Sequence, residues 1–104
     1  MIQVAQTRHS ELDEIIHQRT RLAIMVSLGG VASLDFKELK AQLALTDGNL
    51  STHLSHLEKA GYIGITKRFK GKKPRTTVAI RAKGRMALQR YIALLQGIID
   101  KTRP

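Results

Sequence analysis

Hydrophobic positions along the chain change their period twice, and each change marks a boundary between predicted elements. The first period is helical, because apolar residues recur at three- and four-residue steps over residues 11–28. Ser10 is the candidate N-cap of this helix, and the Gly29-Gly30 pair suits its end. Residues 31–34 are too few for more than a bridge or a short strand.

A second and a third helix follow, joined by a tight turn. The second is predicted over about nine residues, from the candidate N-cap Asp35 to near Ala44. Residues 45–48 form the turn. The third helix, residues 47–60, is predicted from apolar residues at four- and three-residue steps, namely Leu50, Leu54 and Leu57. This arrangement is typical of a helix-turn-helix.

Alternating apolar residues after the third helix predict the two strands of a hairpin. Ile63, Ile65 and Phe69 would share one face of the first strand, and Val78 and Ile80 one face of the second. Residues 70–75 hold a glycine and a proline among cations, which predicts the hairpin loop. Helical spacing then returns over residues 82–99.

These elements predict a mainly α fold with a small β-hairpin. The layout is that of a winged helix-turn-helix domain, with a three-helix core, a wing and a long C-terminal helix. The 104 residues suffice for one compact domain. We divide them into an N-terminal tail (residues 1–10), the winged helix-turn-helix domain (residues 11–81) and a C-terminal dimerisation helix packed on the same domain (residues 82–101).

Composition narrows the chemistry that such a domain could perform. Aromatic residues make up only 4% of the chain, so the core must be aliphatic, and the absence of cysteine excludes disulfides and thiolate chemistry. Residues 1–10 lack an apolar run of signal-peptide length and no run could span a membrane, so a cytoplasmic protein is expected. Neither a phosphate loop nor a nucleophile elbow is present, so we predict no enzyme activity and no cofactor.

The charge is strongly positive and unevenly distributed. The net charge is +10, from 18 Lys and Arg against 8 Asp and Glu. Residues 1–60 carry six basic and seven acidic side chains, whereas residues 61–104 carry twelve basic side chains against Asp100 alone. A generally solvated surface would spread its charge evenly, so this asymmetry indicates a polyanionic partner such as nucleic acid.

The third helix offers one surface for such a partner. At 100° per residue, small and polar side chains cluster opposite its apolar stripe, as a helix in the major groove of DNA requires. The candidate residues are Gly48, Asn49, Ser51, Thr52, Ser55 and His56. Asn49, Thr52 and His56 are expected at base edges, and Ser51 and Ser55 at phosphates or the groove edge. An ordinary solvated helix face is the alternative.

The hairpin offers a second surface, with six cations between residues 67 and 75. Like charges on a tight turn repel one another, so nearby phosphates explain them better than solvent alone. The candidate wing residues are Lys67, Arg68, Lys70, Lys72, Lys73 and Arg75, within a wing spanning residues 67–76.

His53 and His56 are three residues apart on the third helix and could in principle hold a metal ion. No cysteine or matched carboxylate accompanies them locally. We therefore prefer a polar-face role for His56 and a partly buried role for His53, and predict no metal site.

Apolar residues of the last helix cover too wide an arc to be hidden by a core this small. Part of this surface is expected to pack on a second copy of the chain. The candidate interface residues are Leu88, Tyr91, Ile92, Leu95, Ile98 and Ile99. Burial against the first helix within one chain is the alternative.

Six segments, within a resemblance that covers roughly residues 12–97, carry a further signal: Arg21-Leu22-Ala23-Ile24, Asp35-Phe36-Lys37-Glu38-Leu39, Leu45-Thr46-Asp47-Gly48-Asn49-Leu50-Ser51-Thr52-His53-Leu54, Leu57-Glu58-Lys59-Ala60-Gly61-Tyr62-Ile63, residues 67–76, and Ala82-Lys83-Gly84-Arg85. Together they resemble the winged-helix transcriptional regulators of bacteria and archaea in the MarR/ArsR-like group, especially the short winged helix DNA-binding domain family. The central segments are the most specific.

The resemblance implies a homodimer that reads a pseudo-palindromic operator in double-stranded DNA, with residues 48–56 in the major groove and the wing along the backbone or minor groove. The Cys-based metal sites of some ArsR-like sensors cannot exist here, so no effector is implied. We interpret the chain as a sequence-specific DNA-binding transcriptional regulator and expect repression. The alternatives are a winged-helix module with a protein partner on its last helix, and a basic RNA-binding domain.

Overall fold

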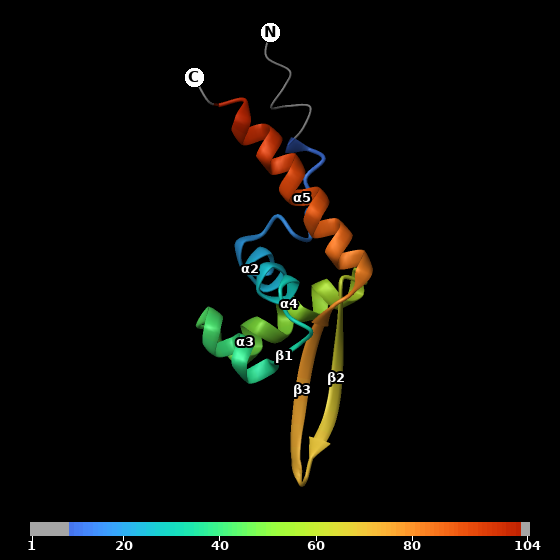
Figure 1. The fold of residues 1–104 in the computed structure, drawn as a ribbon. Coiled ribbons are helices and arrows are strands. Elements are labelled where there is room, and N and C mark those ends of the chain that lie inside the picture. Colours follow the sequence, from blue (N-terminus) through green and yellow to red (C-terminus); the bar gives the residue numbers. More distant parts are fainter. Residues whose placement is uncertain (1–8, 103–104) are drawn as a thin grey trace.

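The computed structural model describes residues 9–102, which form four helices and a three-stranded antiparallel sheet (Figure 1). The predicted order of helix-turn-helix, hairpin and long final helix is confirmed. Among the described helices, none combines the length and hydropathy that a membrane span requires. The elements are α2 (Arg19–Gly29), β1 (Leu34–Asp35), α3 (Phe36–Leu43), α4 (Asp47–Lys59), β2 (Ile63–Lys70), β3 (Lys73–Ile80) and α5 (Ala82–Asp100).

Helix α2 begins at Arg19 and not near residue 11, so this part of the sequence prediction is wrong. The preceding residues form turns that polar side chains stabilise. The Asp13 carboxylate accepts a hydrogen bond from the backbone N–H two residues later at 2.8 Å, and the Gln18 side chain accepts one from the Arg21 N–H at 2.8 Å. Such bonds compete with helical ones. The helical spacing reflects burial instead, because turn residues such as Ile16 are fully buried.

The helix-turn-helix forms as predicted, and capping groups set its turn. Helix α3 begins after Asp35, whose N–H donates to the Glu38 carboxylate at 3.0 Å, and ends at Ala44, which adopts a left-handed conformation with φ of 52°. Helix α4 begins after Thr46, whose hydroxyl oxygen accepts a hydrogen bond from the Asn49 N–H at 3.1 Å. These caps fix where α4 starts on the core.

The hairpin is longer and its turn tighter than the sequence predicts. In the sheet, β3 lies between β1 and β2. The strands β2 and β3 continue to Lys70 and Lys73, so only Gly71 and Lys72 form the turn. Gly71 has a φ of 67°, and glycine at the first turn position suits a two-residue hairpin turn. The cations predicted in a loop therefore lie mostly on strands, whose alternation fixes the face each one occupies.

One face of the hairpin is buried near the body of the domain and exposed near the turn. Near the body of the domain Ile63 and Val78 are fully buried. Phe69 shares their face, as predicted, and pairs with Pro74 across the hairpin, but its side chain is 76% exposed. The difference arises because the hairpin extends well beyond the helices that cover its base (Figure 1).

The core is almost entirely aliphatic, as the composition predicts, with Tyr91 its aromatic member among the described residues. Helices α2, α3 and α4 contribute to it together with the sheet, and its largest fully buried side chains are Ile16, Ile24, Met25, Leu28, Leu39, Leu50, Leu57, Ile63 and Val78. Because the buried residues of α4 form one stripe, the opposite face of that helix points away from the core.

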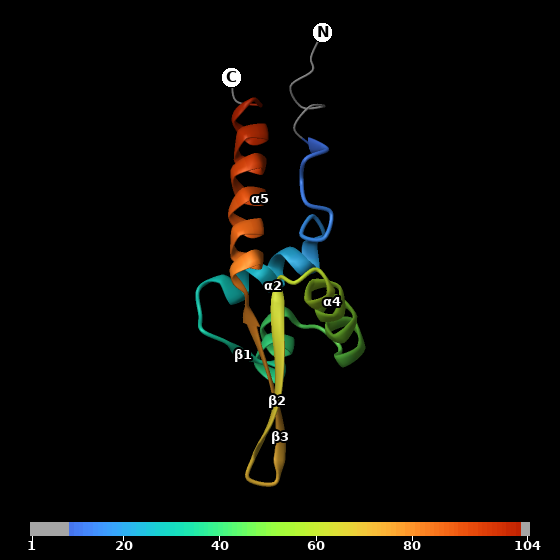
Figure 2. The ribbon, with the colours of Figure 1, turned by 90° about the vertical axis from the view of Figure 1, so that its right-hand side faces the viewer.

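Helix α5 leaves the body in the direction opposite to the wing, which gives the molecule its elongated shape (Figure 2). Its first turn is fixed on Tyr62, whose carbonyl oxygen accepts a hydrogen bond from the Arg81 N–H at 2.9 Å. Gly84 is buried against the same carbonyl group, and a Cβ there would overlap the Tyr62 oxygen. The close approach of α5 to the body therefore requires glycine at this position.

The segment before α2 runs beside α5 (Figure 2) and is held there by two tyrosines. The Tyr62 hydroxyl donates to the Asp13 carboxylate, and the Tyr91 hydroxyl lies 2.8 Å from Nδ1 of His17. Burial, together with this bond to Asp13, raises the pKa of Tyr62 to about 12. The tyrosines thus join three parts of the chain that are distant in sequence.

Candidate nucleic-acid interface

The outward face of α4 carries the residues predicted to approach nucleic acid. All six are exposed: Gly48, Asn49, Ser51, Thr52, Ser55 and His56. The stripe on the opposite side, formed by Leu50, Leu54 and Leu57, is buried. This division leaves small and polar side chains where a groove could approach the helix backbone closely.

Hydrogen bonds within the helix-turn-helix determine which groups on this face remain available. The Thr52 hydroxyl donates to the Gly48 carbonyl oxygen at 2.9 Å. Its oxygen lone pairs and its methyl group remain for a ligand. The Asp47 carboxylate is paired with the Lys40 ammonium of α3 at 2.7 Å, which offsets the negative charge at the start of α4.

His53 lies between the core and the outward face, as predicted, and is half-buried. Its Nδ1 is 3.2 Å from Nη1 of Arg21 on α2. Burial lowers the pKa of His53, and the positive charge of Arg21 and the neighbouring His56 lower it further. A neutral His53 can accept the hydrogen bond that Arg21 donates, so this histidine links α4 to α2.

The wing cations are all exposed, and the strand register distributes them between its two faces. Arg68 is opposite Arg75 and Lys70 is opposite Lys73, so these four side chains share one face. Lys67 lies on the other face and Lys72 in the turn. Like charges directly opposite one another are destabilising in a sheet. A polyanion bound along the wing would relieve this repulsion.

Arg75 makes an ion pair that the sequence did not reveal. Its Nε donates to Oδ1 of Asp35 at 2.7 Å. The pair ties β3 to the residue that precedes α3, and because both side chains keep solvent contact its contribution to stability is about 1 kcal/mol or less. Asp35 and Arg75 are 40 residues apart, and no local pattern signals such a contact.

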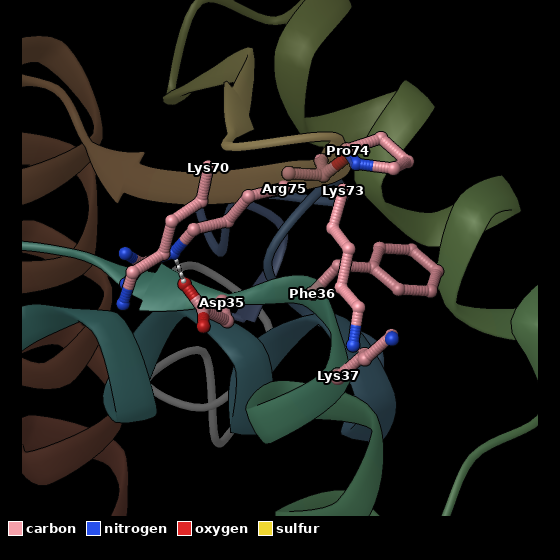
Figure 3. Close-up of a pocket in the computed structure, with 8 residues that line it drawn as sticks. Asp35, Phe36, Lys37, Lys70, Lys73, Pro74 and Arg75 are labelled. Carbon is pink, nitrogen blue, oxygen red and sulfur yellow. Dashed lines mark hydrogen bonds and ion pairs between the residues drawn. The ribbon is translucent and has the colours of Figure 1, made fainter.

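A basic hollow of about 560 Å³ lies between the wing and the start of α3 (Figure 3). In that view the Lys73 side chain extends from the wing toward Lys37 on α3. Lys37 is exposed and adds a cation that the sequence analysis did not assign to the site. In the sequence, the only indication that Lys37 belongs to the site is its position two residues after Asp35. This position becomes informative only because α3 packs beside β3. The hollow is lined by Asp35, Phe36, Lys37, Lys70, Lys73, Pro74, Arg75 and Thr76.

A second groove connects α4 with the base of the wing. Ser51, Ser55 and Glu58 line it from α4, and Lys67 and Thr76 line it from the hairpin. The two surfaces predicted separately from sequence therefore adjoin, and one extended polyanion could contact both.

The structure divides the predicted interface residues of α5 into two groups. Leu88 and Tyr91 are buried within one chain, 8% and 3% exposed. A Cβ at Gly29 of α2 would touch Leu88, and Tyr91 contacts His17, so neither offers surface to a second copy. Burial within one chain, the alternative left open by the sequence, accounts for both. The remaining four keep apolar surface, with Ile92 and Ile99 exposed and Leu95 and Ile98 half-buried.

Comparisons with known proteins are consistent with a nucleic-acid interface formed by α4 and the hairpin. The sequence model of one family, described as a winged helix DNA-binding domain, matches residues 20–99. The chain belongs to this winged helix DNA-binding domain family. The match confirms the resemblance inferred from the six sequence segments. The family and its fold are those of transcriptional regulators and not of enzymes.

Relatives of this winged helix domain include archaeal proteins. An uncharacterized protein of Methanocaldococcus jannaschii is 37% identical over 79 residues, which cover 76% of this chain and 86% of that protein. A structure described as a transcriptional regulator homologue from Pyrococcus horikoshii is 30% identical, with a TM-score of 0.83 over 88% of this chain and 91% of the other. The DNA-bound structure of reduced AbfR is 17% identical, with a TM-score of 0.68 over 96% of this chain and 66% of the other. That likeness shows the fold alone.

Proposed function

We propose that this winged helix domain binds double-stranded DNA as a sequence-specific transcriptional regulator. The observation that carries the proposal is the groove through which the polar face of α4 adjoins the cationic hairpin, lined by Ser51, Ser55 and Lys67. A duplex presents base edges and phosphates side by side, so a surface that offers both polar side chains and cations is complementary to it.

In this proposal α4 enters the major groove and reads base edges. Asn49 is suited to a bidentate contact with adenine, and the Thr52 methyl group to the methyl group of thymine. His56 approaches bases from the next turn of the helix, whereas Ser51 and Ser55 contact phosphates or the edge of the groove. The wing cations, joined by Lys37, contact phosphates along the backbone or in the adjacent minor groove.

The proposed active form is a homodimer on a pseudo-palindromic operator. Ile92, Leu95, Ile98 and Ile99 would pack on the same residues of a second copy. The two α4 helices would then be related by a two-fold axis, with half-sites about one helical turn, 34–36 Å, apart. A dimer that occupies an operator excludes other proteins from it, so we expect repression. AbfR, which shares the fold, has a structure bound to DNA, and this supports DNA as the partner.

Selection of bound sites from a random duplex pool tests this function. We expect an enriched motif with two related half-sites. The logarithm of the binding constant should fall linearly with the logarithm of salt concentration, by about 0.9 for each phosphate contacted. Equal binding to all duplexes would contradict sequence-specific regulation, and competition by double-stranded RNA as strong as by the selected duplex would favour the RNA-binding alternative.

A protein partner on α5 is the second candidate. Met86, Ile92 and Ile99 are 70%, 50% and 43% exposed, and Ile92 and Ile99, seven residues apart, lie on the same face of the helix. A chain that sediments as a monomer at roughly tens of micromolar and fails to bind any duplex would favour this candidate over the dimeric regulator.

A further inference from the structure

The wing ends in an apolar pair surrounded by cations. Phe69 of β2 and Pro74 of β3 are cross-strand partners close to the turn. Phe69 is 76% exposed, more than any other large hydrophobic side chain in residues 9–102. Single exposed apolar residues are common, but this one lies at the end of the hairpin farthest from the body (Figure 1). Its cationic neighbours in sequence are Arg68, Lys70, Lys72 and Lys73.

Folding does not account for a phenylalanine at this position. On the same hairpin face Ile63 is buried and Ile65 half-buried, but the exposed Lys67 already lies beyond the cover of the helices. Phe69 lies farther out still, where it gains little burial in one chain. Threonine and other β-branched residues satisfy an exposed strand position equally well. The apolar area of Phe69 therefore remains available to a partner.

The surrounding surface indicates which partner it is. Phe69 shares its hairpin face with Lys67 and Thr76, and these two residues line the groove that leads to α4. A duplex seated on α4 would thus meet the wing on the side that presents Phe69. Lys67 on the same face and Lys72 in the turn supply cations that could contact phosphates on either side of Phe69.

We propose that Phe69, backed by Pro74, inserts as an apolar wedge into the minor groove of the duplex and partly unstacks one base step. The proposal rests on the proposed function, because it assumes a duplex bound by α4. Apolar side chains are the kind that minor-groove proteins insert between base steps to kink DNA. Cations alone would hold the wing to any sequence. The wedge adds a preference for easily unstacked pyrimidine–purine steps beneath the wing.

Phe69→Thr removes the wedge and keeps a residue suited to a strand. We expect binding to the selected operator to weaken by at least about tenfold. The bend of the duplex, measured by energy transfer between dyes at its ends, should decrease, and sites selected by the variant should lose the preference for one step under the wing. The slope of binding against salt should not change. Thermal unfolding should match the parent protein, because the side chain is exposed.

Two control variants separate the wedge from charge and from general apolar surface. Lys72→Ala should lower the salt slope and keep the bend. Val26→Thr, at an exposed apolar side chain of α2 outside the wing and α5, should change neither the bend nor the affinity. A bend and an affinity unchanged by Phe69→Thr would overturn the wedge and leave DNA binding by α4 intact.

A tryptophan at the same position gives a direct readout. The chain contains no tryptophan, so Phe69→Trp introduces a single tryptophan at the end of the wing, whose emission can be excited apart from that of the two tyrosines. On the selected duplex we expect quenching by stacked bases and protection from acrylamide. Unchanged emission in a formed complex, or equal quenching by a single strand, would contradict insertion into a groove. If neither the parent protein nor the variants bind any duplex, the proposed function fails and the wedge with it.

Discussion

The wing and helix α5 project from opposite ends of one body and expose opposite chemistry. The wing exposes cations around a single aromatic ring, whereas α5 exposes large apolar side chains such as Met86, Ile92 and Ile99. Exposed cations favour a polyanion, and exposed apolar area favours another apolar surface. One domain therefore carries two surfaces suited to different partners, and their separation lets each act without obstructing the other.

The two projections are also attached differently. The wing is a two-stranded ladder whose outer part is tied to the body by the ion pair between Arg75 and Asp35. Helix α5 is attached through tight packing of Gly84 on Tyr62 and through the buried side chain of Leu88. Side chains of the wing should therefore be replaceable with little loss of stability, whereas changes at the base of α5 should destabilise the whole domain.

The largest expected effect comes from charge placed on the exposed apolar face of α5. Ile92→Glu combined with Ile99→Glu should give a folded monomer, because both side chains are exposed in the single chain. Operator binding should then weaken by about 10²–10⁴, since the second half-site is no longer held at high effective concentration. Analytical ultracentrifugation and fluorescence anisotropy measure the two changes.

Gln89→Glu combined with Ala93→Glu is the matched control, because it adds the same charge at exposed positions of α5 beside the apolar face. This variant should remain dimeric and lose only a little affinity through its added charge. A parent protein that is already monomeric, with a footprint over one half-site, would remove dimerisation from the comparison and leave α5 as a docking surface for another protein.

The attachment of α5 is tested by Gly84→Ala. The new methyl group would overlap the Tyr62 carbonyl oxygen, so the start of α5 must shift, at a cost of about 1–3 kcal/mol in the free energy of unfolding. Gly97→Ala in the same helix meets no atom within 4 Å and should stabilise by about 0.5–1 kcal/mol. Urea denaturation measures both. Equal effects of the two substitutions would show that packing on Tyr62 does not hold the helix.

The sequence predicted the elements whose signals are local. Helices α3 and α4 follow from apolar spacing and from capping residues, and the hairpin follows from alternation around a glycine turn. The start of α2 was misjudged because buried residues of a turn segment can have helical spacing, and nothing in that spacing shows that Asp13 bonds the backbone instead.

The features of the candidate site also divide into those that the sequence predicts and those that depend on packing. The exposed face of α4 and the cations of the wing are visible in sequence, because face and charge are properties of single elements. The pairing of Arg75 with Asp35 and the approach of Lys37 to the wing depend on how α3 packs beside β3. The burial of Tyr91 likewise depends on contact with His17, 74 residues earlier, which no periodicity in α5 could reveal.

Helix α4, which we propose reads the DNA sequence, belongs to the body between the wing and α5. Substitutions on its exposed face test sequence reading without altering either projection. Asn49→Ala or Thr52→Ala should reduce the gap between specific and non-specific affinity by about 1–3 kcal/mol. Both residues are exposed, so the domain should stay folded and dimeric. Competition with variant operators, one base pair at a time, identifies the position each residue reads. An alanine variant that keeps the parent preference at every position would show that its residue contacts no base.

The smallest expected effect separates two cations within the wing. Lys72 lies in the turn and forms no described ion pair, whereas Arg75 shares its charge with Asp35 at 2.7 Å. Lys72→Ala should weaken binding to all duplexes alike and lower the salt slope by about one unit. Arg75→Ala should lower it by less, because the Asp35 carboxylate already offsets part of the charge that the guanidinium offers to phosphate.

A double-mutant cycle with Asp35→Asn tests this difference. Asp35→Asn removes a negative charge near the duplex and also frees Arg75, so it should strengthen binding. The gain in binding that comes from freeing Arg75 should disappear when Asp35→Asn is combined with Arg75→Ala. The coupling between the two substitutions therefore measures this gain. Strictly additive changes in the salt slope would mean that the ion pair with Asp35 does not reduce the contribution of Arg75 to phosphate contact.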